Sequence, residues 1–93
     1  MAVTVKIPTQ LRPVTGGEAE AAVEVEEATT VGDVLDGLYD RYDGLRDRIA
    51  VDGDLRRFVN VYVGGEDVRT RDGLETAVPE GSTVILLPAM AGG

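Results

Sequence analysis

The sequence lacks cysteine, histidine and tryptophan altogether, although it is 93 residues long. Thiolate nucleophiles, disulfides, imidazole acid–base catalysis and zinc sites of the Cys/His type are therefore excluded. A chain of this length has room for one hydrophobic core, because single domains commonly reach about 100 to 150 residues. We therefore expect one small domain that binds no metal or cofactor and has no catalytic side chains of its own.

Basic residues are also scarce, since nine Lys and Arg stand against 17 Asp and Glu for a net charge of -8. Nucleic-acid binding needs a positive stripe that displaces counterions, so DNA and RNA are excluded as partners. No apolar stretch approaches the roughly 20 residues of a membrane span, and residues 1–10 lack the basic-then-apolar pattern of a signal peptide. These absences predict a soluble cytoplasmic protein with no membrane partner.

Two alternating segments near the start predict a pair of strands. Residues 3–7 alternate between apolar and polar side chains until Pro8 ends the pattern. Residues 19–25 alternate between Ala or Val and Glu, and they follow Gly16 and Gly17, a pair suited to a turn with positive φ. The glutamates predict a solvated outer row that protects a sheet edge rather than a metal site.

One amphipathic helix is predicted after the second strand. Thr30 followed three residues later by Asp33 resembles a capping box, and apolar residues recur at helical spacing over residues 31–43. Gly44 is expected to stop this helix, and residues 45–49 are expected to add a short helical turn. The polar break that follows at residues 52–54 predicts a turn.

The second half of the chain predicts three more strands. Residues 58–63 are β-branched and aromatic, Gly64 and Gly65 allow a tight reversal, and residues 66–69 return as a short strand. Residues 84–87 form a continuous apolar run, which predicts a central strand buried on both faces.

The order strand, strand, helix, strand, strand, strand predicts an α+β fold of the β-grasp type, in which a mixed sheet packs on one main helix. The first strand is expected to lie parallel to the last one. We expect residues 1–87 to form this domain and residues 88–93 to form an extended, flexible C-terminal tail.

The tail indicates how the protein could react with a partner. It follows the predicted central strand, carries no charged side chain and ends on Gly92 and Gly93. The last seven residues, extended, reach about 23 Å, enough to thread a terminal carboxylate into a partner's active site. That carboxylate is a poor electrophile at neutral pH, so acyl transfer from Gly93 needs prior activation, for example as a mixed anhydride with AMP. The residues expected to thread into the partner are Pro88, Ala89, Met90, Ala91 and Gly92.

A β-grasp domain that ends in Gly-Gly resembles the ThiS/MoaD family of ubiquitin-like sulfur carriers, and among them the carriers of cysteine biosynthesis. The resemblance spans nearly the whole chain. It is carried by Ile7-Pro8-Thr9 with Leu11-Arg12-Pro13 and Thr15-Gly16-Gly17, by residues 57–63 with Glu66-Asp67-Val68-Arg69, and by Leu87-Pro88-Ala89 with Ala91-Gly92-Gly93.

The resemblance implies a protein co-substrate and not an enzyme. It implies an E1-like enzyme that uses ATP to adenylate Gly93, followed by sulfur transfer that leaves a C-terminal thiocarboxylate. The acceptor that it favours is a pyridoxal-phosphate cysteine synthase using O-phosphoserine, after which a zinc metalloprotease would free cysteine. Thiazole, molybdopterin or secondary-metabolite sulfur insertion stay open as other destinations.

Val59, Val61 and Val63, with Val84 and Leu86, are expected in the core under the helix. An apolar patch is then expected on the open face of the sheet, formed by Phe58, Tyr62, Ile85 and Leu87. It has the position of a partner-docking surface, but a loop covering the same residues is an equally open interpretation. The function also has alternatives: a ubiquitin-like modifier conjugated to lysines through Gly93, or a plain interaction module that does not need the tail.

Overall fold

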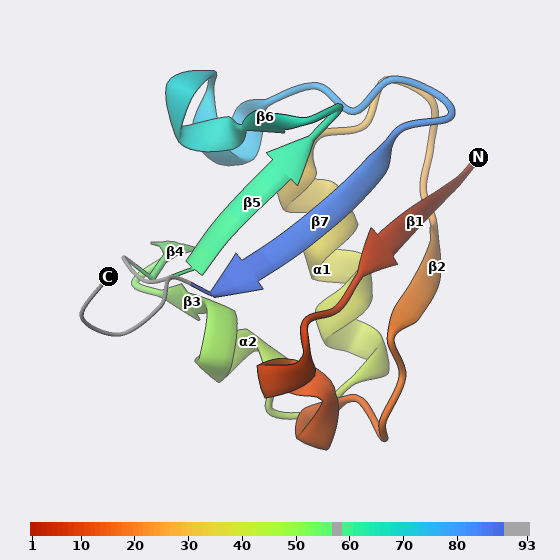
Figure 1. Cartoon of the computed structure of the whole chain (residues 1–93). Helices are drawn as coiled ribbons and strands as arrows, with labels where there is room; N and C mark the ends of the chain where they lie inside the picture. The colour runs from red at the N-terminus through yellow and green to blue at the C-terminus, as the bar shows by residue number, and fades with distance from the viewer. Residues whose placement is uncertain (57–58, 89–93) are drawn as a thin grey trace.

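The computed structural model describes residues 1–56 and 59–88, with the backbone alone for Pro88 (Figure 1). The strands are β1 (Ala2–Lys6), β2 (Glu20–Glu24), β3 (Ala50–Val51), β4 (Asp54–Leu55), β5 (Val59–Val63), β6 (Glu66–Asp67) and β7 (Thr83–Pro88). The helices are α1 (Val31–Arg41) and α2 (Leu45–Ile49), and the 3-10 helices are η1 (Thr9–Val14), η2 (Val68–Thr70) and η3 (Gly73–Glu75).

Five strands form one mixed sheet in the order β2-β1-β7-β5-β6. The first and last strands, β1 and β7, pair in parallel, whereas the other neighbouring strands pair antiparallel. The main helix α1 crosses one face of this sheet (Figure 1). This arrangement confirms the predicted β-grasp fold, including the central place of the last strand.

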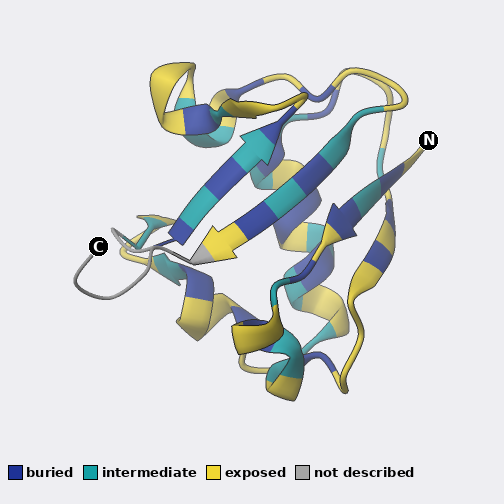
Figure 2. Ribbon diagram, in the orientation of Figure 1, coloured by how far each residue is buried: buried dark blue, intermediate teal, exposed yellow. Residues whose placement is uncertain are grey.

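The core lies between the sheet and the helices. The inward rows of β5 and β7 are buried, as are the apolar residues of α1, and Figure 2 shows buried and less buried residues alternating along β5 and β7. The period-2 patterns of the sequence thus place the inward valines correctly. The buried residues of β1, β2, α1, β5 and β7 are Val3, Val5, Ala21, Val23, Val31, Val34, Leu35, Leu38, Val59, Val61, Val63, Val84 and Leu86.

The capping box at the start of α1 forms as predicted. The amide of Asp33 donates to Thr30 Oγ1 at 3.3 Å, and the amide of Thr30 donates to Asp33 Oδ2 at 3.4 Å. The helix ends at Arg41, two residues before the predicted end, because Tyr42 is extended at φ -129°. Gly44 then takes a φ of 85° and begins α2, the expected short helix.

A close approach between α1 and β2 depends on Gly37. A Cβ atom built on this glycine would lie 2.6 Å from Val23 Cγ1, closer than real Cβ contacts allow. The absent side chain therefore sets the distance between the helix and the sheet edge that it covers.

The prediction that the last strand is buried on both faces is wrong. Val84 and Leu86 are buried, whereas Ile85 is half-buried and Leu87 is 45% exposed. The physical reason is that α1 and α2 cover one face of the sheet, so an apolar run need not be buried on the other.

Three short elements also differ from the prediction. Residues 9–14 form η1, for which the sequence predicted no element, and the predicted strand 66–69 ends at Asp67, just before η2. The turn at residues 52–54 is the tip of a hairpin between β3 and β4. Elements of only a few residues are too short to show a periodic pattern, so periodicity does not predict them.

Candidate functional site

The predicted reactive end of the chain lies partly outside the described residues. Ala89, Met90, Ala91, Gly92 and Gly93 are not among the residues that the structure describes. What it does show is the root of the tail, where Pro88 is paired with Val59 at the end of β7. The central strand β7 therefore ends beside the start of β5, and the tail follows it in the sequence.

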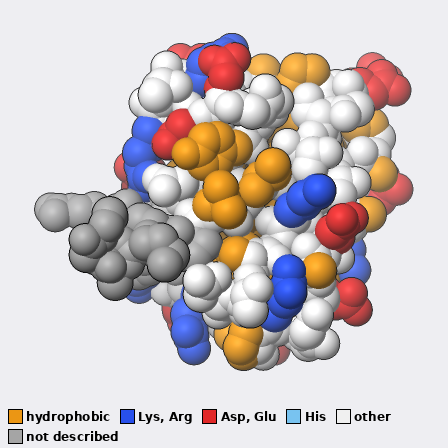
Figure 3. Space-filling view, in the orientation of Figure 1, with side chains coloured by type: hydrophobic (Ala, Val, Ile, Leu, Met, Phe, Trp, Pro, Cys, Tyr) orange, Lys and Arg blue, Asp and Glu red, His pale blue; other side chains and the backbone are white. Residues whose placement is uncertain are grey.

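The open face of the sheet, opposite α1, carries a cluster of apolar side chains at its centre. The register brings Ile85 opposite Tyr62, and Leu87 opposite Asn60 on β5. Tyr62 and Ile85 are half-buried and Leu87 is 45% exposed, so all three side chains reach solvent. Figure 3 shows hydrophobic side chains gathered on this face. Phe58, the fourth residue predicted for this patch, lies outside the described residues.

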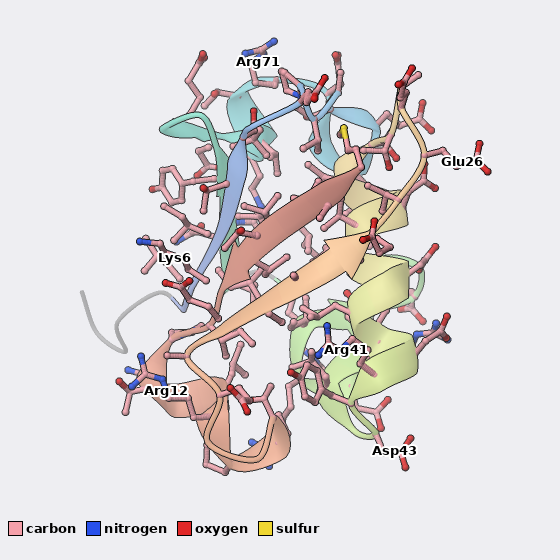
Figure 4. All side chains as sticks on the ribbon, turned by 90° about the vertical axis from the view of Figure 1, so that its right-hand side faces the viewer. Lys6, Arg12, Glu26, Arg41, Asp43 and Arg71 are labelled. Carbon is pink, nitrogen blue, oxygen red and sulfur yellow. The ribbon has the colours of Figure 1, made fainter. Side chains whose placement is uncertain are left out.

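One row of side chains crosses the whole sheet through Ile85. Cross-strand pairing places Glu20, Lys6, Ile85, Tyr62 and Asp67 side by side on the five strands. Lys6 is exposed and projects on the side of the sheet away from α1 (Figure 4). The open face therefore has an apolar centre with a cation directly beside it, although the protein as a whole is acidic.

A second cation, Arg69, braces the strand beside the tail root. Its two terminal nitrogens donate to Asn60 Oδ1 at 2.7 Å and to the carbonyl oxygen of Arg56 at 2.6 Å. The same Arg56 carbonyl accepts from the amide of Val59 at 3.0 Å. Arg69 thus ties the segment before β5 to β5 itself, at the end where β5 pairs with Pro88.

Sequence reasoning missed this role of Arg69 because it placed the residue in a strand. Asp67 instead caps η2, since its Oδ1 accepts from the amide of Arg69 at 2.8 Å, and Thr70 Oγ1 donates to the carbonyl of Asp67. An Asp followed three residues later by Thr was the available signal, because Asp favours N-caps and turns over strands.

The geometry of this face suits binding rather than catalysis. Within residues 1–56 and 59–88, no group of three or more Asp, Glu, His or Cys side chains is arranged to hold a metal ion. No helix in the same part of the chain is both long and apolar enough to cross a membrane. An exposed apolar patch of this kind is typical of surfaces that bind other proteins.

Comparison with known proteins identifies one matching family and several proteins of similar sequence. The model of the ThiS family matches residues 5–93. The sulfur carrier protein CysO of Mycobacterium tuberculosis (strain H37Rv) is 46% identical over 96 aligned residues, which cover 100% of both chains. Small archaeal modifier protein 3 of Haloferax volcanii is 40% identical over 77 residues, which cover 83% of this chain and 84% of the modifier.

A solved structure matches the fold as well. In the crystal structure of the Amycolatopsis orientalis BexX/CysO complex, the matching chain superposes with a TM-score of 0.85 at 49% identity. The match covers 99% of this chain and 100% of that one.

Proposed function

This protein belongs to the ThiS family, and from that membership we propose that it is a sulfur carrier whose C-terminal carboxylate, on Gly93, takes up sulfur and donates it to a biosynthetic enzyme. The observation that carries the proposal is the full-length, 46% identity to the sulfur carrier CysO. The protein is accordingly a co-substrate of other enzymes and not an enzyme itself, which suits a sequence without histidine and cysteine.

The proposed chemistry proceeds in two transfers at Gly93. A carboxylate oxygen attacks the α-phosphorus of ATP in an E1-like enzyme, so that pyrophosphate leaves and an acyl-adenylate forms. A sulfide equivalent then attacks the acyl carbon, the bond to AMP breaks, and a thiocarboxylate remains. AMP is a good leaving group whereas a free carboxylate offers none, which is why the activation must come first.

The tail is proposed to reach the active sites of partner enzymes. The five residues from Ala89 to Gly93 span about 17 Å when extended. They carry no charged side chain, so entering a closed site has a low desolvation cost for the tail itself. Pro88 is paired with Val59 in the sheet, so we propose that it anchors the arm and that the part entering the partner's active site follows it.

The open face is proposed to dock these partners. Tyr62, Ile85 and Leu87 form an apolar centre beside the tail root, and we assign Phe58 to the same surface by sequence. The BexX/CysO complex supports the binding of a partner protein in general, because a chain similar to this one is found there in a complex.

The proposed acceptor is a cysteine synthase with pyridoxal phosphate that uses O-phosphoserine, with a zinc metalloprotease releasing the product. The similarity to CysO favours this destination. A thiazole-synthase-like enzyme or another sulfur-inserting enzyme is the alternative acceptor. We propose that the protein and these partner enzymes work in the cytoplasm.

Intact-mass spectrometry tests the carrier role. The full chain is incubated with a purified E1-like enzyme, ATP and sulfide, and the expected result is a mass increase equal to one exchange of oxygen for sulfur. Reactions without ATP, and with a chain that lacks Gly92 and Gly93, are the controls and should show no increase. If the complete reaction leaves the mass unchanged while a known carrier of the family is converted beside it, the proposal is wrong.

A second candidate function is conjugation to other proteins through Gly93. The 40% identity to a small archaeal modifier protein favours it. The same incubation with added cell extract distinguishes the two functions, because conjugation produces isopeptide adducts on lysines of other proteins. Adducts formed without any oxygen-to-sulfur exchange would replace the carrier proposal by the modifier one.

A further inference from the structure

The helix layer carries a groove that the sulfur-carrier function does not use. It lies between α1, α2, the β3–β4 hairpin and η3, and it encloses about 620 Å³. Its apolar lining comes from Leu35 and Tyr39 of α1, from Val51 and Leu55 of the hairpin, and from Leu74 of η3. Because α1 packs on the face of the sheet opposite Tyr62 and Ile85, this groove is separate from the open face (Figure 1).

Both ends of the groove are closed by specific contacts. At one end, η3 approaches α1 so closely that a Cβ atom on Gly32 would lie 3.2 Å from the carbonyl oxygen of Leu74. At the other end, the guanidinium of Arg46 lies 5.1 Å from the centre of the Tyr39 ring. Burial, and then the nearby Asp36 carboxylate, raise the pKa of Tyr39 to about 12. The groove is therefore bounded and defined.

The hairpin keeps an apolar side chain at the rim. Its tip is a two-residue turn in which Asp52 has a φ of 53° and Gly53 a φ of 80°, both in the left-handed region that tight hairpins favour. This turn places Val51 opposite Asp54. Val51 is 44% exposed, so its side chain is available for contact at the rim. The aliphatic side chain of Val51 is thus paired across the hairpin with a residue that carries a carboxylate, Asp54.

The charges around the groove are mostly negative. Four carboxylates line it, those of Asp36, Asp47, Asp52 and Asp54, together with two arginines. The arginines are already engaged, Arg46 over the Tyr39 ring and Arg56 through its Nε, which donates to the carbonyl of Asp47 at 2.8 Å. Over residues 1–56 and 59–88, the side-chain ion pairs lie elsewhere, at Met1 with Glu24 and at Arg71 with Glu66.

We propose that this groove docks a basic segment of a partner protein that presents an arginine or lysine next to an aliphatic side chain. The cation lies between the rim carboxylates of Asp36 and Asp52, and the aliphatic side chain packs on Val51 and Leu55. Charge complementarity selects this occupant, because an acidic segment would be repelled by the same rim. The inference does not rest on the sulfur chemistry, and the groove lies on the opposite side of the sheet from the open face.

Nuclear magnetic resonance on the full, 15N-labelled chain tests the proposal. The probe is a short amphipathic peptide of arginine and leucine, and the control peptide carries glutamate in place of each arginine. The basic peptide is expected to shift the amide signals of Val51, Gly53, Leu55 and Leu74, and its affinity is expected to fall as the salt concentration rises above about 0.15 M. The acidic peptide is expected to shift none of these signals.

Two substitutions make the test specific. Asp52→Asn keeps a residue type that tolerates the left-handed turn, and it is expected to weaken peptide binding about two- to fivefold. Val51→Ser removes the exposed aliphatic contact and is expected to weaken binding about three- to tenfold. The matched control is Asp43→Asn, which removes the same charge from an exposed position outside the groove and should leave the affinity unchanged.

Three results would overturn the proposal. In the first, the basic peptide shifts the signals of Tyr62 and Ile85 and leaves those of the groove in place. In the second, Asp43→Asn weakens binding as much as Asp52→Asn does, so that net charge alone accounts for the affinity. In the third, the groove signals move with protein concentration in the absence of peptide, which would make a second copy of this chain the occupant.

Discussion

The two faces of β7 differ in what they do, although the strand is apolar on both. Val84 and Leu86 point into the core and are buried, whereas Ile85 and Leu87 point to the open face and reach solvent. Inward and outward positions thus alternate along residues 84–87, although every residue of this run is apolar. The comparison teaches that apolar residues on the inner face stabilise the fold, while those on the outer face are available to a partner.

The largest expected effect comes from the inner face. Leu86→Ala removes a side chain that is 1% exposed and leaves a cavity in the core, so we expect a loss of about 2 to 5 kcal/mol in the free energy of unfolding. Urea unfolding followed by circular dichroism measures it. If the free energy of unfolding falls by less than about 1 kcal/mol, Leu86 behaves like a surface residue. The inner and outer faces of β7 would then not differ in their contribution to stability.

The next effect concerns how closely α1 covers the inner face. Gly37→Ala places a methyl group 2.6 Å from Val23 Cγ1, so α1 or Val23 must move, and we expect a loss of about 1 to 3 kcal/mol from overpacking. Alanine also gains about 1 kcal/mol over glycine in a helix interior, so the expected net loss is about 0 to 2 kcal/mol.

Gly32→Ala is the matched control for that substitution. It lies in the same helix, but its added methyl group meets the Leu74 carbonyl at 3.2 Å, which calls for a smaller adjustment. Thermal unfolding of the two variants should place Gly37→Ala clearly below Gly32→Ala in melting temperature. Equal melting temperatures would show that the contact with β2 does not limit the approach of the helix.

Much of this comparison could be predicted from the sequence, and the limits have physical causes. The alternation of Val59, Val61 and Val63 indicated their inward direction, and Thr30 with Asp33 indicated the start of α1. Periodicity within 84–87 could not indicate which face the helices cover, because an apolar run contains no polar residues to mark an exposed side. That information lies in tertiary packing, which brings α1 to one side only.

The same limit applies to the functional surfaces. Gly92 and Gly93 at an uncharged end predicted an arm, and this stays a prediction because both residues lie outside the described part of the chain. Arg69 had only a local signal, the spacing of Asp67 and Thr70 that favours a cap over a strand, and the groove behind α1 had none. Both depend on short elements, η2 and the β3–β4 hairpin, which contain two or three residues each and bring side chains together over distances that the sequence pattern does not encode.

A smaller effect is expected on the outer face, at Arg69. Arg69→Ala removes the hydrogen bonds to Asn60 and to the Arg56 carbonyl, and because these are exposed we expect a loss of about 0.5 to 1.5 kcal/mol. Amide hydrogen exchange should show the opening concentrated at Val59 and Asn60. Arg69→Lys keeps the charge but loses the planar fork, so it should open the same amides. Faster exchange across the entire sheet would instead assign Arg69 a role in the fold as a whole.

The smallest expected effect on stability, and the sharpest test of the comparison, is Leu87→Ser. Leu87 is 45% exposed, so its replacement should change the free energy of unfolding by no more than about 0.5 kcal/mol, although it neighbours Leu86 in the chain. Its loss should instead lower the kcat/KM of the E1-like enzyme for this carrier about tenfold, as truncating a docking contact worth about 1.4 kcal/mol does. Steady-state kinetics and urea unfolding on the same preparation give both numbers. Should Leu87→Ser destabilise the domain and leave kcat/KM unaltered, the outer face would be part of the fold's own stabilisation, and partner docking would have to be sought elsewhere on the molecule.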